Sequence, residues 1–156
     1  MLVDVTEIEI RAVRFDDPAV QKLVSDALAD LGERYGGSGD DTPVDLSDFD
    51  PPGGAFFAAT HGGDMVGCGG WRRHGDDAEL KRMYTAPAVR GRGVARRMLA
   101  TIEESARAAG CRRVILETGD KQPEAVRLYE SAGYARIDDF GYYRGHASVL
   151  SYARVL

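Results

Sequence analysis

Glycines and arginines alternate in one short stretch of the chain, which reads RGRGVARR from residue 90 to residue 97. Apolar residues at helical spacing begin at Val94, so the stretch leads directly into a helix. A helix N-terminus presents unpaired N–H groups and about half a positive charge. Glycines let an anion approach that backbone, and arginines add charged hydrogen-bond donors. The stretch therefore predicts a diphosphate site, with a simple turn beside solvated arginines as the alternative.

Two other phosphate-binding motifs do not fit this stretch. The dinucleotide-binding loop G-x-G-x-x-G needs a third glycine where Arg96 stands, and it follows the first strand of a strand–helix–strand unit. A P-loop needs Gly-Lys followed by Ser or Thr, which the stretch lacks. The expected anion site therefore belongs to another architecture.

Hydropathy patterns predict the elements that position this site. We expect strands at residues 5–13, 55–60, 65–71, 78–85, 112–118, 134–137 and 148–155, and helices at 18–35, 94–109 and 122–132. The central three strands form an antiparallel meander, and a strand–helix–strand crossover follows them. This order predicts an α/β layered architecture with a mixed sheet, formed by a single domain over residues 1–156.

Composition narrows the classes of partner. The net charge of −5 and the pI of about 5.2 argue against nucleic acid. The N-terminus does not resemble a signal peptide, and no apolar run approaches the roughly 20 residues of a membrane span. We therefore expect a cytoplasmic protein that binds no membrane. Cys68 and Cys111 are expected to be buried thiols, and no metal site is expected because no His stands at ligand spacing from them.

The loop at residues 38–54 contains five aspartates. It is interpreted either as a solvated surface loop or as the rim of a substrate site that attracts cations.

The region around the anion site resembles motif A of the GNAT N-acetyltransferases, whose pattern is Arg/Gln-x-x-Gly-x-Gly/Ala. Arg90, Gly93 and Ala95 match its three specified positions. The segment QPEAVRLYESAGY, residues 122–134, resembles motif B of the same family. The two motifs stand in the family's order, and the other expected elements match its fold over nearly the whole chain.

The resemblance implies the acyl-CoA N-acyltransferase fold, a mostly antiparallel twisted sheet of six to seven strands with helices on both faces. It also implies acetyl-CoA as co-substrate and direct acetyl transfer to a primary amine. The N–H groups of Arg92 to Arg97 would hold the diphosphate, and the backbone of Met83 and Thr85 would pair with the pantetheine arm. The coenzyme residues implied in this way are Met83, Tyr84, Thr85, Arg90, Gly91, Arg92, Gly93, Val94, Ala95, Arg96 and Gln122. Gln122 stands where motif B commonly has Asn, and Gln keeps the amide but adds a methylene.

Amine acylation needs a base for the amine proton and a proton donor for the departing thiolate. The resemblance places Tyr129 as the donor, with a core tyrosine as the alternative. Glu79 is the expected base, acting through water, with a strand glutamate in a salt bridge as an equal alternative. Glu117, on the next strand, is the second candidate.

The acceptor is expected to be a small-molecule or amino-acid-like amine, contacted by Arg82, Glu117, Tyr142 and Tyr143. Regular alternation along the strand would place Glu79, Lys81 and Met83 on one face and Leu80, Arg82 and Tyr84 on the other. A protein N-terminal or lysine acetyltransferase and a non-catalytic acyl-CoA-binding module are the alternative functions. Many members of the family dimerise, so a homodimer is one expectation.

Overall fold

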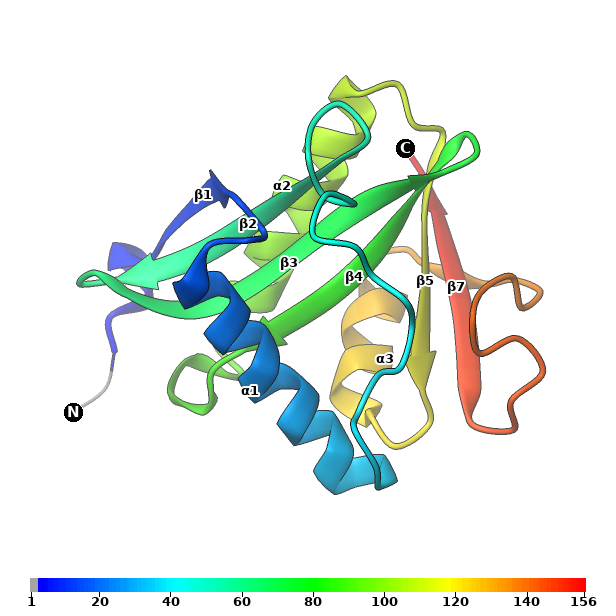
Figure 1. Cartoon of the computed structure of the whole chain (residues 1–156), viewed down its shortest axis with the longest axis horizontal. Helices are drawn as coiled ribbons and strands as arrows, with labels where there is room; N and C mark the ends of the chain where they lie inside the picture. Colours follow the sequence, from blue (N-terminus) through cyan, green and yellow to red (C-terminus); the bar gives the residue numbers. More distant parts are fainter. Residues whose placement is uncertain (1–2) are drawn as a thin grey trace.

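A computed structural model describes residues 3–156 (Figure 1). These residues form one sheet of seven strands in the order β1-β2-β3-β4-β5-β7-β6. The strands are β1 (Glu9–Val13), β2 (Gly54–His61), β3 (Asp64–His74), β4 (Asp77–Thr85), β5 (Arg113–Gly119), β6 (Ala135–Arg136) and β7 (Val149–Val155). The β4–β5 pair is parallel and the other pairs are antiparallel. The predicted fold class is confirmed.

Helices cover both faces of the sheet (Figure 1). Helix α1 (Pro18–Tyr35) packs on one face, where its apolar residues join Phe49 and Phe56. Helix α2 (Val94–Ala108) packs on the other face through an apolar stripe that includes Met98 and Ile102, and α3 (Pro123–Ser131) lies on that same side. The helices begin and end near the predicted residues because proline or glycine stands at or beside their first residues, and a side chain caps the start of α1. Asp17 accepts a hydrogen bond from the Ala19 N–H at the start of α1.

The first predicted strand is shorter than expected. Residues Val5–Glu7 form a 3₁₀ turn, and β1 begins only at Glu9. The turn forms because the Asp4 carboxylate accepts hydrogen bonds from the N–H and the hydroxyl of Thr6. Such a local side-chain acceptor offers the backbone an alternative to strand pairing.

The alternation expected along β4 is wrong beyond Lys81. Lys81 pairs with Gly70 and Tyr84 with Cys68, so β4 carries one extra residue here, and Arg82 adopts a positive φ of 61°. This β-bulge turns Met83 to the α2 face, where it packs on the core, while Lys81 and Arg82 both reach Asp40 near α1. The bulge thus brings two neighbouring cations to the same side of the sheet.

Strands β4 and β5 separate soon after they begin to pair. Their register comprises only Ala78 with Val114 and Glu79 with Ile115. From Leu80 onward β4 pairs with β3 alone, so its other edge has backbone groups that β5 does not use. The separation opens the sheet toward the N-terminus of α2.

Candidate active site

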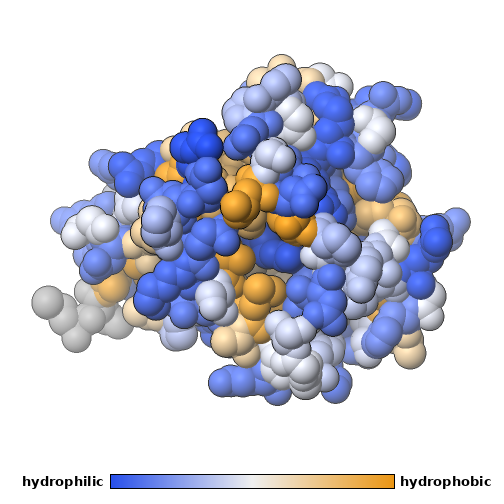
Figure 2. All heavy atoms as spheres, in the orientation of Figure 1, coloured by the Kyte–Doolittle hydropathy of each residue, from blue (hydrophilic) through white to orange (hydrophobic). Residues whose placement is uncertain are grey.

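A cavity of about 960 Å³ lies where β4 and β5 separate. Helix α1, β4, the start of α2, β5 and α3 form its walls. On this face of the molecule apolar side chains are visible at the centre, within a rim of hydrophilic ones (Figure 2). The cavity is large enough for an extended cofactor arm and a small acceptor.

The start of α2 forms one end of the cavity. Gly93 is the N-cap residue with a left-handed φ of 87°, and no side chain caps the helix. A Cβ built at Gly91 or Gly93 meets no atom within 4 Å, so the backbone is open to an anion. The first helical hydrogen bond runs from the Arg97 N–H to the Gly93 carbonyl, 3.1 Å. The N–H groups of residues 91–96 are therefore available to a diphosphate, whereas that of Arg97, which was also predicted, is engaged.

The four arginines between residues 90 and 97 fall into two pairs, one that lines the cavity and one that does not. Arg90 and Arg96 line the cavity. The Arg90 Nε donates to the Thr85 carbonyl at 2.8 Å, and its guanidinium lies 5.3 Å from the centroid of the Tyr84 ring. Arg96 donates to the hydroxyl of Ser131 on α3. These two side chains keep positive charge beside the open helix start.

The side chains of Arg92 and Arg97 lie outside the cavity, and the buried Nη1 of Arg92 has no hydrogen-bond partner within residues 3–156. The prediction for Arg92 concerned its backbone N–H, which lies ahead of Arg97 and has no helical partner, so it stays a prediction. Arg97 donates to the carbonyl oxygens of Val5 and Ile8, at 3.0 and 2.8 Å, and so fastens the N-terminal segment to α2. The other predicted coenzyme residues line the cavity: Met83, Tyr84, Thr85, Arg90, Gly91, Gly93, Val94, Ala95, Arg96 and Gln122.

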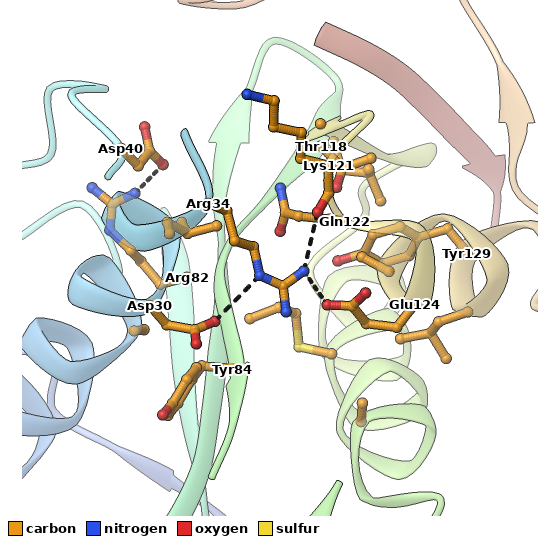
Figure 3. A pocket seen from close by; sticks show the side chains of 18 of the residues that line it. Asp30, Arg34, Asp40, Arg82, Tyr84, Thr118, Lys121, Gln122, Glu124 and Tyr129 are labelled. Atoms are coloured by element: carbon orange, nitrogen blue, oxygen red, sulfur yellow. Dashed lines mark hydrogen bonds and ion pairs between the residues drawn. The ribbon is translucent and has the colours of Figure 1, made fainter. Parts of the chain in front are cut away.

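Arg34 connects two walls of the cavity, a feature that the sequence analysis missed. It projects from α1 and contacts Glu124 of α3, with its Nη1 3.2 Å from the Lys121 carbonyl and its Nε 3.8 Å from Asp30 (Figure 3). No local pattern could have identified this residue, because its partners Lys121, just before α3, and Glu124, on α3, lie about 90 positions away in the chain.

Tyr129 projects from α3 into the cavity, with its hydroxyl directed inward (Figure 3). Its side chain is almost fully buried beside the Tyr134 ring. Burial raises the pKa of the Tyr129 phenol well above its usual value. The hydroxyl therefore stays protonated and can act as a proton donor.

The two candidate bases have different surroundings. Glu79 does not line the cavity, its side chain is 5% exposed, and its Oε1 accepts a hydrogen bond from Arg72 Nε at 2.9 Å. Glu117 does line the cavity. Its Oε2 accepts from the Tyr143 N–H at 3.0 Å, while its Oε1 is buried and has no partner among residues 3–156. Burial raises the pKa of the Glu117 carboxyl.

The end of the cavity where the acceptor is predicted to bind is formed by the loop after α1 and the link before β7. The Tyr143 hydroxyl accepts a hydrogen bond from the Asp41 N–H at 2.7 Å, which joins the two segments. Burial raises the pKa of Tyr143 to about 12. Tyr142, by contrast, is 55% exposed and does not line the cavity. The structure therefore brings Tyr143, but not Tyr142, to the cavity, although the two rings lie 5.0 Å apart.

The acidic loop reaches the cavity, but its carboxylates bind cations of the chain itself. Asp40 pairs with Lys81 at 3.1 Å and with Arg82, as Figure 3 shows for Arg82. Asp48 pairs with Arg72 at 2.8 Å. These two aspartates are neither solvated nor free to attract a cationic acceptor, so both interpretations of the loop need correction here.

Neither a candidate metal site nor a membrane-spanning helix is found within residues 3–156. Within residues 3–156, no group of three or more His, Cys, Asp and Glu side chains is arranged to hold a metal ion. None of the helices described here combines the length and apolarity that a membrane span requires. Cys68 and Cys111 are buried thiols, as predicted.

Comparison with known proteins identifies the class to which this cavity belongs. The model of the acetyltransferase (GNAT) family matches residues 21–134. An IAA acetyltransferase from Azospirillum brasilense is 36% identical over 127 residues, which cover 80% of this chain and 82% of that protein.

Solved structures of acyltransferases share the fold of this chain. An acyl-CoA N-acyltransferase from Klebsiella pneumoniae has a TM-score of 0.81 and 28% identity, over 96% of this chain and 97% of that one. The PaiA N-acetyltransferase of Thermoplasma acidophilum was solved in complex with coenzyme A. It covers 96% of this chain and 99% of its own with a TM-score of 0.75. At 13% identity, this last likeness shows the shared fold alone.

Proposed function

Because the chain belongs to the acetyltransferase (GNAT) family, we propose that it transfers the acetyl group of acetyl-CoA directly to the primary amine of a small molecule. One observation carries the proposal, namely that β4 and β5 separate beside an uncapped helix start. The free edge of β4 can hydrogen-bond an extended pantetheine arm as an added strand would, and the open N–H groups before Arg97 can hold the diphosphate. We further propose that residues 1–156 act as one catalytic domain.

The residues present fit this coenzyme. Met83, Tyr84 and Thr85 supply the strand edge, and Gly91 with Gly93 to Arg96 supply the bare helix start. Arg90 and Arg96 add positive charge at the same end, while Gln122 lies on the α3 side. When bound, acetyl-CoA supplies an acetyl group activated as a thioester.

Two side chains of this protein would handle the protons. We propose that Tyr129 donates the proton of its phenol to the leaving sulfur, since its hydroxyl faces the cavity (Figure 3) and stays protonated at neutral pH. We propose that Glu117, rather than Glu79, accepts the amine proton, directly or through water. Its Oε1 is unpaired and its raised pKa makes the carboxylate a better base, whereas Glu79 is held by Arg72 outside the cavity.

The bridge between two segments at the proposed acceptor end supports a small acceptor over a protein. The hydrogen bond between the Asp41 N–H and the Tyr143 hydroxyl joins two segments across that end, where a peptide acceptor would need an open groove. Protein acetylation and a purely coenzyme-binding role are the alternatives.

Binding and turnover together test the proposal. Acetyl-CoA at 100 times its Kd should raise the free energy of unfolding by about 2.7 kcal/mol, measured as a shift in Tm. Free thiol release should then appear with small amines and not with protein or peptide acceptors. Binding without transfer to any acceptor would indicate a binding module, transfer only to peptides would indicate a protein acetyltransferase, and the absence of a Tm shift would refute the proposed site.

A further inference from the structure

The acceptor end of the cavity contains more positive charge than its own carboxylate neutralises. Lys81 and Arg82 both bind one oxygen of Asp40, its Oδ2. The side chains of the two cations are each only 7% exposed, and that of Asp40 is 17% exposed. All three residues line the cavity. Lys81, Arg82 and Asp40 together carry a net charge of +1 in a largely buried position, and Glu117 is a further carboxylate on the cavity wall that Lys81 acts on.

We propose that Lys81 and Arg82 form a subsite for a carboxylate of the acceptor, so that the substrate class is amino acids rather than simple amines. This inference rests on the proposed function and names the substrate class of the same site. The acceptor carboxylate is the second anion of the cluster and binds beside Asp40.

The hydrogen-bond donors of the cluster favour an added anion. A lysine ammonium has three donors, and Lys81 Nζ makes one hydrogen bond within residues 3–156, to Asp40 at 3.1 Å. The guanidinium of Arg82 has five N–H donors and uses two groups, one toward Asp40 and one toward the Thr42 carbonyl at 3.4 Å. A carboxylate can take up the remaining donors and balance the charge, which a neutral acceptor cannot do.

The backbone supports this role for Arg82. Among the non-glycine residues of the range 3–156, Arg82 alone has a positive φ, which is 61°. The bulge at this point places the Arg82 side chain on the same side of the sheet as that of Lys81. Strained backbone of this kind is retained where the surrounding structure needs the side chain in one place. Arg72 does not belong to the subsite because Glu79 and Asp48 already neutralise it.

The partner group for the amine lies on the neighbouring strand. Glu117 lines the same cavity, and its unpaired Oε1 can accept a hydrogen bond from the acceptor nitrogen or from a water. Lys81 is one of the charges that act on Glu117, so the two groups are close enough to engage one small molecule. An acceptor with both a carboxylate and an amine matches this pair.

The test compares amino acids with their C-terminal amides, which keep the amine and the side chain but lose the negative charge. We expect kcat/KM to be at least tenfold higher for the free acids. The amide amines are less basic and thus more often neutral, so this difference works against the expected result. Equal or better use of the amides would overturn the inference while leaving the acetyltransferase intact.

Two variants of opposite charge sharpen the test. Lys81→Met leaves Asp40 and Arg82 as a neutral pair, and we expect it to abolish the preference for acids. Asp40→Asn removes the resident anion, and we expect it to lower the KM for acids several-fold without lowering that for amides. A preference that survives unchanged in Lys81→Met would also overturn the inference.

Thermal stability provides a readout that does not need acetyl-CoA. The free amino acids should raise the Tm of the parent protein, their amides should not, and Lys81→Met should lose the response. If acetyl-CoA neither binds nor reacts, the proposed function fails. The Tm shift caused by free amino acids still tests the carboxylate subsite, because it does not depend on acetyl-CoA. If no acid raises the Tm and none is acetylated, the subsite is refuted as well.

Discussion

The two ends of the cavity are built in different ways. The proposed coenzyme end consists mainly of one continuous segment, the end of β4 and the start of α2. The proposed acceptor end consists of side chains from distant parts of the chain, chiefly Asp40, Lys81, Arg82, Glu117 and Tyr143. A backbone site depends on local conformation, whereas a side-chain site exists only when the whole fold is formed.

The two ends also differ in their electrostatics. At the coenzyme end, the N–H groups ahead of Arg97 have no helical partner and attract an anion without any side-chain ion pair. At the acceptor end, the charges are buried and paired, and a single excess cation or an unpaired oxygen sets the preference. Substitutions at the first end should therefore act through conformation, and those at the second through charge and proton transfer.

The largest effect is expected where the two ends meet, at Tyr129. The Tyr129→Phe variant removes the proton donor and should lower kcat by roughly 100-fold or more, because general acid catalysis contributes 10²–10⁴-fold. The Kd of acetyl-CoA should stay nearly unchanged, as measured by calorimetry. Tyr152→Phe is the matched control, since its hydroxyl bonds to Glu130 and the residue does not line the cavity. Near-normal turnover in Tyr129→Phe would remove this residue from the mechanism.

At the acceptor end, Glu117→Gln should lower kcat/KM at neutral pH by roughly 10- to 100-fold. Because burial raises the pKa of Glu117, the parent should lose activity as the pH falls through a value above the usual glutamate range. The variant should lack this acid limb. A parent-like pH profile in the variant would contradict the proposed role.

The same variant should change stability with a defined sign. A carboxyl whose pKa is raised on folding stabilises the protein most below its unfolded pKa, and this contribution is lost as the pH rises through the folded pKa. Glu117→Gln mimics the neutral form, so its Tm should exceed that of the parent near neutral pH. The difference should vanish in acid, and a difference that grows as the pH falls would be inconsistent with a raised pKa.

At the coenzyme end, Gly93→Val should weaken coenzyme binding by roughly 5- to 30-fold. A β-branched residue in the left-handed conformation at this N-cap costs about 1–2 kcal/mol, and relief of that strain would move the N–H groups. The Kd of coenzyme A should rise, while kcat at saturation should change little. Gly62→Val is a matched control, because this left-handed glycine in the β2–β3 turn also has open space around it but lies outside the cavity. Equal Kd values for both variants would contradict the assignment of the anion site.

The contrast between the two ends explains what could be predicted from the sequence. Helix α2 and its bare start follow from the spacing of apolar residues and from Gly91 and Gly93, all of which act locally. The bulge at Arg82 could not be predicted, because it depends on how β4 registers against Cys68 and Gly70 of β3. Regular alternation is the natural assumption in the absence of that register.

The adjacent Tyr142 and Tyr143 illustrate the same limit. Both lie in one polar link, and their sequence surroundings are nearly the same. Tyr143 faces the cavity because its hydroxyl binds the Asp41 N–H, 102 positions away in the chain, and its own N–H binds Glu117. Contacts of this range carry no local signal, so the motif located the coenzyme end while the acceptor end needed the fold.

The smallest effect on kcat is expected from a substitution of Glu79. This substitution tests whether Glu79 or Glu117 is the base. Glu79→Gln keeps an oxygen that can accept from Arg72 Nε, and Arg72 retains its ion pair with Asp48. The variant should therefore fold normally, with kcat within about threefold of the parent and an unchanged acid limb, because proton transfer needs a group that reaches the substrate or its water. Parallel pH–rate profiles of Glu79→Gln and Glu117→Gln measure this directly. Loss of the acid limb in Glu79→Gln and its retention in Glu117→Gln would assign the base to β4 and require a water path from the cavity to a carboxylate that is now held by Arg72.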